Sequence, residues 1–387
     1  MNIPFHKPMT PKSFDKIYPE SITNGWLTTG PEVRSFEYLL SDFAESDFAV
    51  AVNSCTAALH LALAAMGFSR GDQFIVPTYT FAASVEVGEY LGMKPILVDC
   101  DENYNINLNQ VEDLLLNNNK IKAIIPVHFA GKPVDMANLY SMIAKKDIFI
   151  LEDAAHALEA ISNLGKVGDT NHATAFSFYA NKNITTAGEG GAITTNNQKL
   201  ADKIRKLSLH GMSKDGWNRF KTGSKWQYDV SDLGYKYNLT DMSAVFGKWQ
   251  FSHLEQWYKK RVHIFNEYQK NFKNIDGILC PSQPNENEKH AHHLYIIRLK
   301  KKSWKINRDT LIKLLNEAGI GTSVHYMPIH MHSYYQKKYG FKPDDFPQSK
   351  DYFENVITLP LYPLLKKKEV RYIIDCINDL WEKYRIS

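Results

Sequence analysis

The sequence predicts an α/β fold: a large three-layer α/β/α domain with a mostly parallel sheet, followed by a smaller α+β domain. Three observations lead to this prediction. Short apolar runs alternate with amphipathic stretches through the first half of the 387 residues. The runs recur every 25 to 30 residues or so, as expected for strands of a parallel sheet joined by helices. Near residues 240–255 this alternation stops and a different pattern begins.

In the first half, short apolar runs predict buried strands and stretches with apolar residues at helical spacing predict helices. The expected strands cover residues 74–77, 95–99, 123–128, 148–153, 175–179 and 191–195. The expected helices between the first four of these strands and around them cover residues 56–66, 81–91, 108–116 and 134–144. This order predicts helices on both faces of one sheet.

The second half begins with expected helices at 199–210 and 241–273, separated by an aromatic and basic loop. From about residue 290 the pattern is that of a compact α+β unit. Its expected strands cover 293–299, 322–326 and 356–360, and its expected helices cover 308–318 and 366–384. We therefore expect two domains, at residues 1–250 and 251–387.

Composition narrows the class of protein. Hydrophobic residues make up 44% and charged residues 23% of the chain, which is ordinary for a soluble globular enzyme. We expect neither a signal sequence nor a membrane span. The four cysteines lie far apart, which argues against a zinc site or a disulfide framework and favours the cytoplasm. The net charge of +4 comes from scattered residues and favours small anionic ligands over nucleic acid.

Two segments carry polar residues where a strand meets a helix or a loop. Ser54, Cys55 and Thr56 lead into an alanine-rich helix, whose first N–H groups and dipole bind phosphate well, although simple N-capping gives the same pattern. Asp153 ends an expected buried strand, where a carboxylate needs a cationic partner. A protonated pyridine nitrogen is such a partner. An N-cap or a structural salt bridge explains the same carboxylate, and for this residue taken alone the structural interpretation is favoured.

The most informative stretch runs from Ser177 to Gly191. Lys182 stands there in a loop of small and polar residues, after an expected strand and before a glycine-rich turn. Lysine forms Schiff bases, and its pKa shifts easily on desolvation. An isolated loop lysine is more often a solvated charge, so the neighbouring motifs decide between the two interpretations.

Taken together, the motifs resemble those of the sugar-nucleotide aminotransferases (DegT-like), which have the aspartate-aminotransferase fold (fold type I) of pyridoxal-phosphate (PLP) enzymes. The resemblance covers nearly the whole chain. It is carried by Gly25–Pro31, Asn53–His60, Pro77–Phe81, Glu152–Ala157, Ser177–Gly191, His210–Gly211 and Gly234–Asp241. Two departures stand out: Ala187 is interposed before Gly188, and Leu158–Glu159 stands where the family often has glycine.

The resemblance implies roles for individual residues. Lys182 would form the Schiff base with PLP and move the proton, and pyridoxamine phosphate would be the alternate form of the cofactor. Asp153 would hold the pyridine nitrogen, and His156 would lie beside the phenolic oxygen unless it is a structural histidine. Phe81 would cover one ring face. The phosphate would be bound by Ser54, Cys55, Thr56 and Ser177, and by Asn238 of a neighbouring subunit in a homodimer with shared active sites.

Substrate residues are expected on both domains. Thr29 lies in the first motif, Arg219 lies in a lysine-rich loop that could meet a nucleotide diphosphate, and His325 and His330 lie near a predicted strand end of the small domain. The segments 319–326 and 359–363 are most similar to enzymes that aminate 4-keto sugars for surface polysaccharides and lipid A. The expected reaction is therefore amination of a nucleotide-linked keto sugar, with L-glutamate as donor, for lipopolysaccharide, O-antigen or capsule.

Several alternatives remain at this point. A 3-keto sugar nucleotide would suit the same motifs, and an inactive scaffold with a regulatory role would retain the fold. A sugar dehydratase of this fold would carry histidine in place of Lys182. The cluster His290, His292 and His293 suggests a metal, but no carboxylate or cysteine stands at ligand spacing. We therefore expect exposed strand histidines and no metal.

Overall fold

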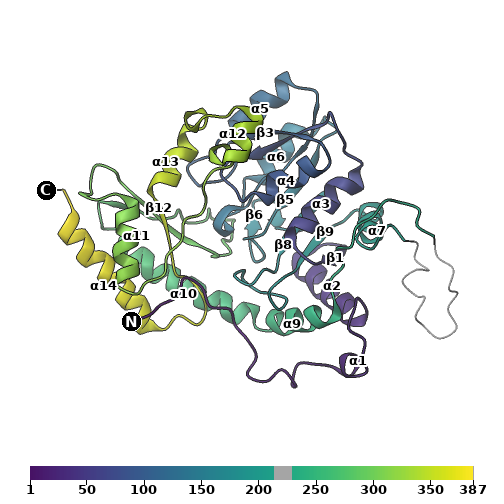
Figure 1. The fold of residues 1–387 in the computed structure, drawn as a ribbon, viewed down its shortest axis with the longest axis horizontal. Helices are drawn as coiled ribbons and strands as arrows, with labels where there is room; N and C mark the ends of the chain where they lie inside the picture. The colour runs from purple at the N-terminus through teal and green to yellow at the C-terminus, as the bar shows by residue number, and fades with distance from the viewer. Residues whose placement is uncertain (213–228, 387) are drawn as a thin grey trace.

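The computed structural model describes residues 1–212 and 229–386, and a seven-stranded sheet forms the core of its larger unit (Figure 1). The strand order is β1-β9-β8-β5-β4-β2-β3. Strands β3, β2, β4, β5 and β8 run parallel, while β9 is antiparallel to both of its neighbours. The strands are β1 (Phe48–Val52), β2 (Gln73–Pro77), β3 (Lys94–Val98), β4 (Ile121–Ile124), β5 (Phe149–Asp153), β8 (Ala173–Ser177) and β9 (Gly191–Thr195). The prediction of a mostly parallel α/β sheet is confirmed.

Helices cover both faces of this sheet because alternate strand residues point to opposite sides. On one face, apolar side chains of the strands pack against α3 (Cys55–Met66), α4 (Ala83–Tyr90) and α7 (Gln198–Leu207). On the other face lie α2 (Pro31–Ala44), α5 (Leu108–Asn117), α6 (Met136–Ile143) and α9 (Asp241–Phe251). A short hairpin, β6 (Ile161–Ser162) and β7 (Gly165–Lys166), follows β5.

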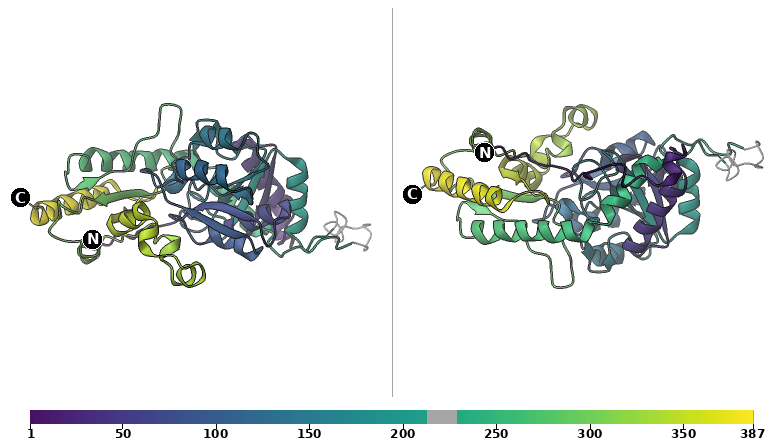
Figure 2. Two further views of the ribbon diagram at one scale, coloured as in Figure 1. Left: turned by 90° about the horizontal axis from the view of Figure 1, so that it is seen from above. Right: turned by 90° about the horizontal axis from the view of Figure 1, so that it is seen from below.

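The smaller unit has a three-stranded antiparallel sheet of β10 (Ile278–Leu279), β11 (Tyr295–Leu299) and β12 (Val356–Leu359). Its apolar core is shared with α10 (Leu254–Phe272), α11 (Arg308–Glu317) and α14 (Lys367–Tyr384). Helices α12 (Ser333–Tyr339) and α13 (Pro347–Asn355) connect this unit to the large sheet, and α1 (Glu20–Thr23) lies in the N-terminal segment. Figure 2 shows the two units side by side, with the long helix α10 extending along the smaller one.

The N-terminal segment belongs in space to the smaller unit. Ile3 pairs with Ile320, donating to the Gly319 carbonyl and accepting from the Gly321 N–H. The chain then crosses to the large unit, where the Met9 carbonyl accepts a hydrogen bond from Gln250. The division at residue 250 stays a prediction.

Three details differ from the expectations. The predicted helix 241–273 is two helices, α9 and α10, separated at Ser252–His253. Residues 322–326 form no strand, because only Ser323 makes an isolated bridge, to Thr358. Several elements were not predicted, among them strands β1 and β10 and helices α2, α12 and α13.

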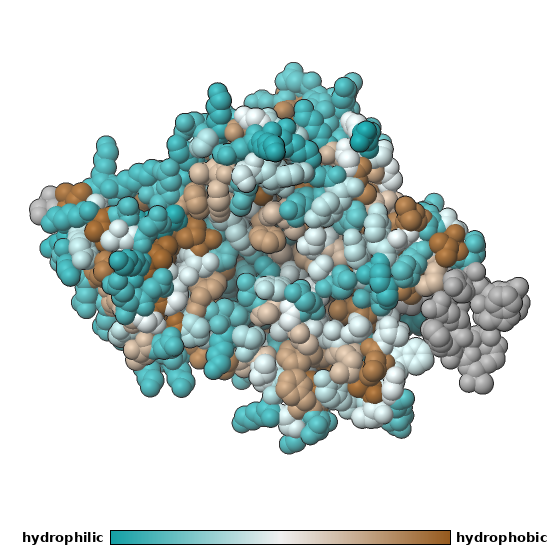
Figure 3. Space-filling view, in the orientation of Figure 1, coloured by the Kyte–Doolittle hydropathy of each residue, from teal (hydrophilic) through white to brown (hydrophobic). Residues whose placement is uncertain are grey.

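The surface seen in Figure 3 is mostly hydrophilic, with separate hydrophobic patches. Among the described helices, none combines the length and apolarity needed to cross a membrane.

Candidate active site

Asp153 and Lys182 lie at one end of the central sheet. Asp153 is the last residue of β5, and Lys182 lies in the loop between β8 and β9. Because β5 and β8 are neighbouring parallel strands, their carboxyl ends meet at the same edge, where ligands bind in open α/β sheets. The fold therefore brings the two residues together.

The Asp153 carboxylate is buried and fully oriented. Its Oδ2 accepts from Ser84 Oγ at 2.7 Å, and its Oδ1 accepts from the Ala155 N–H at 3.1 Å. Only 5% of the residue is exposed, and none of the ion pairs among the described residues includes it. A buried carboxylate without a cation is costly, so this arrangement suits a ligand that supplies a protonated nitrogen.

The Lys182 amine is placed to act as a nucleophile. Burial lowers its pKa to about 8, and the Cys55 thiol and the Asp153 carboxylate oppose that shift. Its backbone N–H donates to the Tyr179 carbonyl at 2.9 Å, which fixes the turn that carries it. An amine with this pKa is half unprotonated at about pH 8, where an ordinary lysine is almost wholly protonated, and Schiff-base formation requires the neutral amine.

The start of α3 offers a phosphate-binding cradle. Ser54 is the N-cap residue, and its hydroxyl accepts from the Ala57 N–H at 3.0 Å. The N–H groups of Cys55 and Thr56, in the first turn, have no intrahelical acceptor. Gly191 packs directly on this turn: a Cβ there would lie 2.4 Å from the Ser54 carbonyl carbon and 2.5 Å from the Cys55 nitrogen. The predicted phosphate segment thus has the required geometry, and Ser177 lies at the adjoining end of β8.

His156 is held in one tautomer. Its Nδ1 accepts from the Ala130 N–H at 3.2 Å, so the neutral ring carries its proton on Nε2, which lies 3.1 Å from the Tyr326 hydroxyl. Burial, Lys182 and His325 lower the pKa of His156 well below its usual value, which keeps the ring neutral. Phe81, just before α4, is 61% exposed and its ring lies 5.9 Å from that of Tyr326.

Thr29 and Asn238 meet at the start of α2. Asn238 Nδ2 donates to Thr29 Oγ1 at 2.7 Å, and Thr29 Oγ1 donates to the Leu239 carbonyl at 2.5 Å. Asn238 also pairs with Val52 at the end of β1. Thr29 and Asn238 therefore lie together near the α3 cradle, and neither belongs to the lysine loop.

The predicted substrate histidines differ in their surroundings. His325 is close enough to Lys182 for the lysine charge to add to burial in lowering its pKa to about 3, and its Nδ1 lies 2.9 Å from Thr358 Oγ1. His330 is completely buried. Its Nδ1 lies 2.8 Å from Thr78 Oγ1 and its Nε2 donates to the Pro343 carbonyl at 3.2 Å, so both nitrogens are used within the protein. Arg219 lies outside the described residues.

The histidine cluster after residue 289 is not exposed, so that prediction is wrong. The exposed fractions of His290, His292 and His293 are 3%, 6% and 6%. All three precede β11; His290 and His292 pack against α10, with the His292 ring 4.4 Å from that of Phe265. No cluster of the described side chains has the composition of a metal site.

Two residues of the site were missed by sequence reasoning. Ser84 orients Asp153 from the first turn of α4, and Tyr326 reaches His156 from the smaller unit. The position of Ser84 in an expected helix gave a weak signal. No sequence spacing connects Tyr326 to His156, because they are 170 residues apart and meet only through the fold.

A loop lysine with a lowered pKa, a buried strand-end aspartate without an ion-pair partner among the described residues and a helix N-terminus for phosphate together define a PLP-dependent transferase of fold type I. Comparison with known proteins identifies the family. The chain belongs to the DegT/DnrJ/EryC1/StrS aminotransferase family, whose model matches residues 10–378. It is a PLP-dependent sugar aminotransferase, as the sequence motifs predicted.

Relatives match along the whole chain. The spore coat polysaccharide biosynthesis protein SpsC of Bacillus subtilis is 40% identical over 98% of this chain and 97% of its own length. Spr1654 of Streptococcus pneumoniae, solved in PMP and PLP forms, is 33% identical in the PMP form with a TM-score of 0.90, covering 99% of this chain and 100% of that one. PseC of Helicobacter pylori, an aminotransferase of pseudoaminic acid biosynthesis, is 27% identical with a TM-score of 0.89, covering 99% and 100%.

Proposed function

We propose that this enzyme transfers the amino group of L-glutamate to a nucleotide-linked 4-keto-6-deoxy sugar in the biosynthesis of a surface polysaccharide. The observation that carries the proposal is the placement of the Asp153 carboxylate and of Lys182, with its lowered pKa, at the same end of the sheet as the α3 cradle. SpsC, a spore coat polysaccharide biosynthesis protein, and PseC, an aminotransferase of pseudoaminic acid biosynthesis, support the proposed pathway. A cytoplasmic location stays a prediction.

The cofactor fits residues from three elements. The α3 N-terminus would hold its phosphate, Asp153 would hold its protonated nitrogen and Lys182 would bond to it covalently. When bound, the pyridinium ring supplies an electron sink for the bonds that are broken at the amine-bearing carbon. The protein contributes the fixed dipoles and charges around that ring, already oriented by Ser84 and Ala155.

Lys182 would act as the proton carrier once an incoming amine displaces it. A pKa near 8 lets the amine accept and release a proton close to neutral pH, which is the property of an effective general base and acid. His156 stays neutral and donates from Nε2, so it would orient oxygen atoms without itself changing charge.

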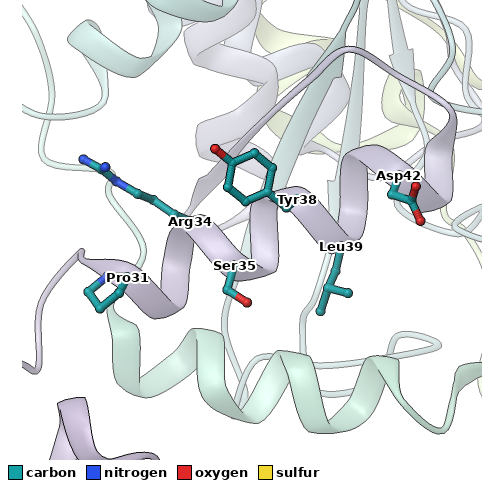
Figure 4. A pocket seen from close by; sticks show the side chains of 6 residues that line it. All are labelled: Pro31, Arg34, Ser35, Tyr38, Leu39 and Asp42. Atoms are coloured by element: carbon teal, nitrogen blue, oxygen red, sulfur yellow. The ribbon is translucent and has the colours of Figure 1, made fainter.

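We propose further that the enzyme is a homodimer with Asn238 at the shared site. Leu233, just before the Asn238 segment, is 91% exposed, and Tyr38 and Leu39 on α2 are 75% and 40% exposed. Figure 4 shows the side chains that line a shallow pocket along α2: Pro31, Arg34, Ser35, Tyr38, Leu39 and Asp42. Exposed apolar side chains of this size favour burial against a partner.

The charges of α2 suit a second copy of the same helix. Arg34 and Asp42 lie at equal sequence distance on either side of Tyr38. A two-fold axis through Tyr38 would align two antiparallel α2 helices and place each arginine opposite an aspartate. Light scattering should therefore give a dimer, and Arg34→Asp should weaken it while the exchange Arg34→Asp/Asp42→Arg restores it. An Arg34→Asp variant that dimerises like wild type would remove α2 from the interface.

The substrate is tested by a panel of 4-keto and 3-keto sugar nucleotides with UDP, dTDP and GDP. Glutamate should convert the PLP form to the PMP form, followed by absorbance, and a 4-keto sugar should convert it back. Faster turnover of 3-keto sugars would replace the proposed substrate by its positional isomer. If glutamate fails to form the PMP form while a sugar nucleotide still reacts with it, only the proposed amino donor is wrong.

A further inference from the structure

Glu159 and Arg261 form a buried ion pair beneath the lysine loop. Glu159 follows His156 in the chain, at the position where the sequence departs from the family, and Arg261 belongs to α10. Each side chain is only 2% exposed. Among the described residues Arg261 Nε and Nη1 have no hydrogen-bond partner, so this buried cation depends on Glu159 for its neutralisation.

The ion pair fixes the orientation of Asn183, the residue after Lys182. Asn183 Nδ2 donates to Glu159 Oε2 at 2.5 Å and to the Ala291 carbonyl at 3.2 Å. Both partners are pure acceptors, so the amide nitrogen must face them and Oδ1 must point the other way. There Oδ1 lies 2.9 Å from His293 Nδ1, which consequently carries the ring proton.

The chain of contacts then reaches His156. The rings of His293 and His156 lie 4.4 Å apart at an interplanar angle of 33°. Burial holds the pKa of both histidines well below the usual value, so neither ring changes charge in the physiological range. The Glu159 carboxylate thus fixes the orientation of the Asn183 amide. The amide in turn fixes which ring nitrogen of His293 carries the proton, and the His293 ring packs on that of His156.

We propose that the Glu159–Arg261 pair is a positioning device for the active site, acting through Asn183 on the Lys182 loop and through His293 on His156. The proposal rests on the assigned role of Lys182 and adds residues that contact neither cofactor nor substrate. Its physical basis is the link along the chain: the Asn183 side chain is anchored to Glu159 and to the Ala291 carbonyl, whereas the adjacent Lys182 is anchored by a backbone bond. Releasing Asn183 lets the amine move towards water.

PLP capture, the formation of the Schiff base between added PLP and Lys182 of the apoenzyme, depends on pH. This pH dependence reports whether the Lys182 amine is buried or has moved towards water. Only the neutral amine attacks the aldehyde, so capture by the apoenzyme should rise with pH through the Lys182 pKa of about 8. An amine released towards water recovers a pKa nearer the ordinary value of 10.5. The titratable groups coupled to Lys182 are Cys55, Asp153, His6, His156, His293 and His325, and none of them is changed in the test.

The experiment compares Asn183→Ala with Asn196→Ala. Asn196 also donates to a carboxylate, Asp169, and accepts from a backbone N–H, but it lies at the far end of β9. Both variants should lose similar thermal stability. Only Asn183→Ala should move the midpoint of the capture profile upward, by about one pH unit, because only it frees the lysine loop. Equal profiles in the two variants would overturn the proposal.

A second variant protects the test against misfolding. Glu159→Leu alone leaves Arg261 charged and buried, and is expected to unfold readily. The double variant Glu159→Leu/Arg261→Met removes both charges and also the oxygen that accepts from Asn183, so it should fold and show the same upward shift as Asn183→Ala. A folded double variant with the wild-type midpoint would overturn the role of the ion pair. Wild-type protein whose PLP is not attached at Lys182, by mass spectrometry after reduction, would instead refute the site assignment itself.

Discussion

Replacing Asp153 with asparagine removes the negative charge that we propose holds the cofactor nitrogen, while keeping the shape of the side chain. The oxygen of the introduced amide can still accept from the Ala155 N–H, and its nitrogen can donate to Ser84 Oγ, which has Thr80 as its other partner at 2.8 Å. The local fold should therefore persist. The change acts on the electrostatics of the site alone.

The expected cost follows from burial. Asp153 is 5% exposed, so its interaction with a protonated nitrogen is that of a buried pair, and removing one partner of such a pair costs about 3–5 kcal/mol. At about 1.4 kcal/mol per factor of ten, Asp153→Asn should slow the glutamate half-reaction by roughly 10²- to 10⁴-fold. PLP should remain attached to Lys182.

The assay is single-turnover absorbance after mixing the PLP enzyme with glutamate. Asp99→Asn provides the control, because Asp99 is also buried after a parallel strand but accepts from the Gln348 and Ser349 N–H groups at the start of α13. That variant should lose stability and keep its rate. A rate within threefold of wild type for Asp153→Asn, with PLP bound, would refute the reasoning about the electron sink.

Three further outcomes are expected. Lys182→Ala should hold PLP only non-covalently, and mass spectrometry after reduction should show no adduct; an adduct of unchanged yield would place the Schiff base elsewhere. Asn238→Ala should weaken PLP by about 1–3 kcal/mol, or roughly ten- to a hundredfold, because one hydrogen-bond donor to the phosphate is lost; an unchanged titration would remove Asn238 from the phosphate site. Gly191→Ala should raise the Kd for PLP more than Ala192→Gly does, because the new methyl group would lie only 2.4 Å from the Ser54 carbonyl carbon. Equal affinities would show that the α3 turn can shift without cost.

Much of the fold was predictable because its signals are local. Buried parallel strands leave continuous apolar runs, and amphipathic helices leave a 3.6-residue period, so most elements were located within a few residues. Strand β1 shows what could still have been found: Phe48–Val52 is an apolar run directly before the cap of α3. The pairing of β9 between β1 and β8 has no such signal, since it depends on contacts far apart in the chain.

The residues of the active site also fall into those that the sequence predicts and those that only the tertiary structure reveals. Sequence alone determined the class of enzyme, because the motifs that contain Lys182, Asp153 and Ser54–Thr56 resemble, in the same order along the chain, those of one aminotransferase family. Only the tertiary structure decided the partners of these residues. Ser84 behind Asp153, Tyr326 beside His156 and the Glu159–Asn183 contact join segments from 24 to 170 residues apart. A buried polar group must find its hydrogen-bond partner in three dimensions, and nothing in local periodicity records which distant residue supplies it.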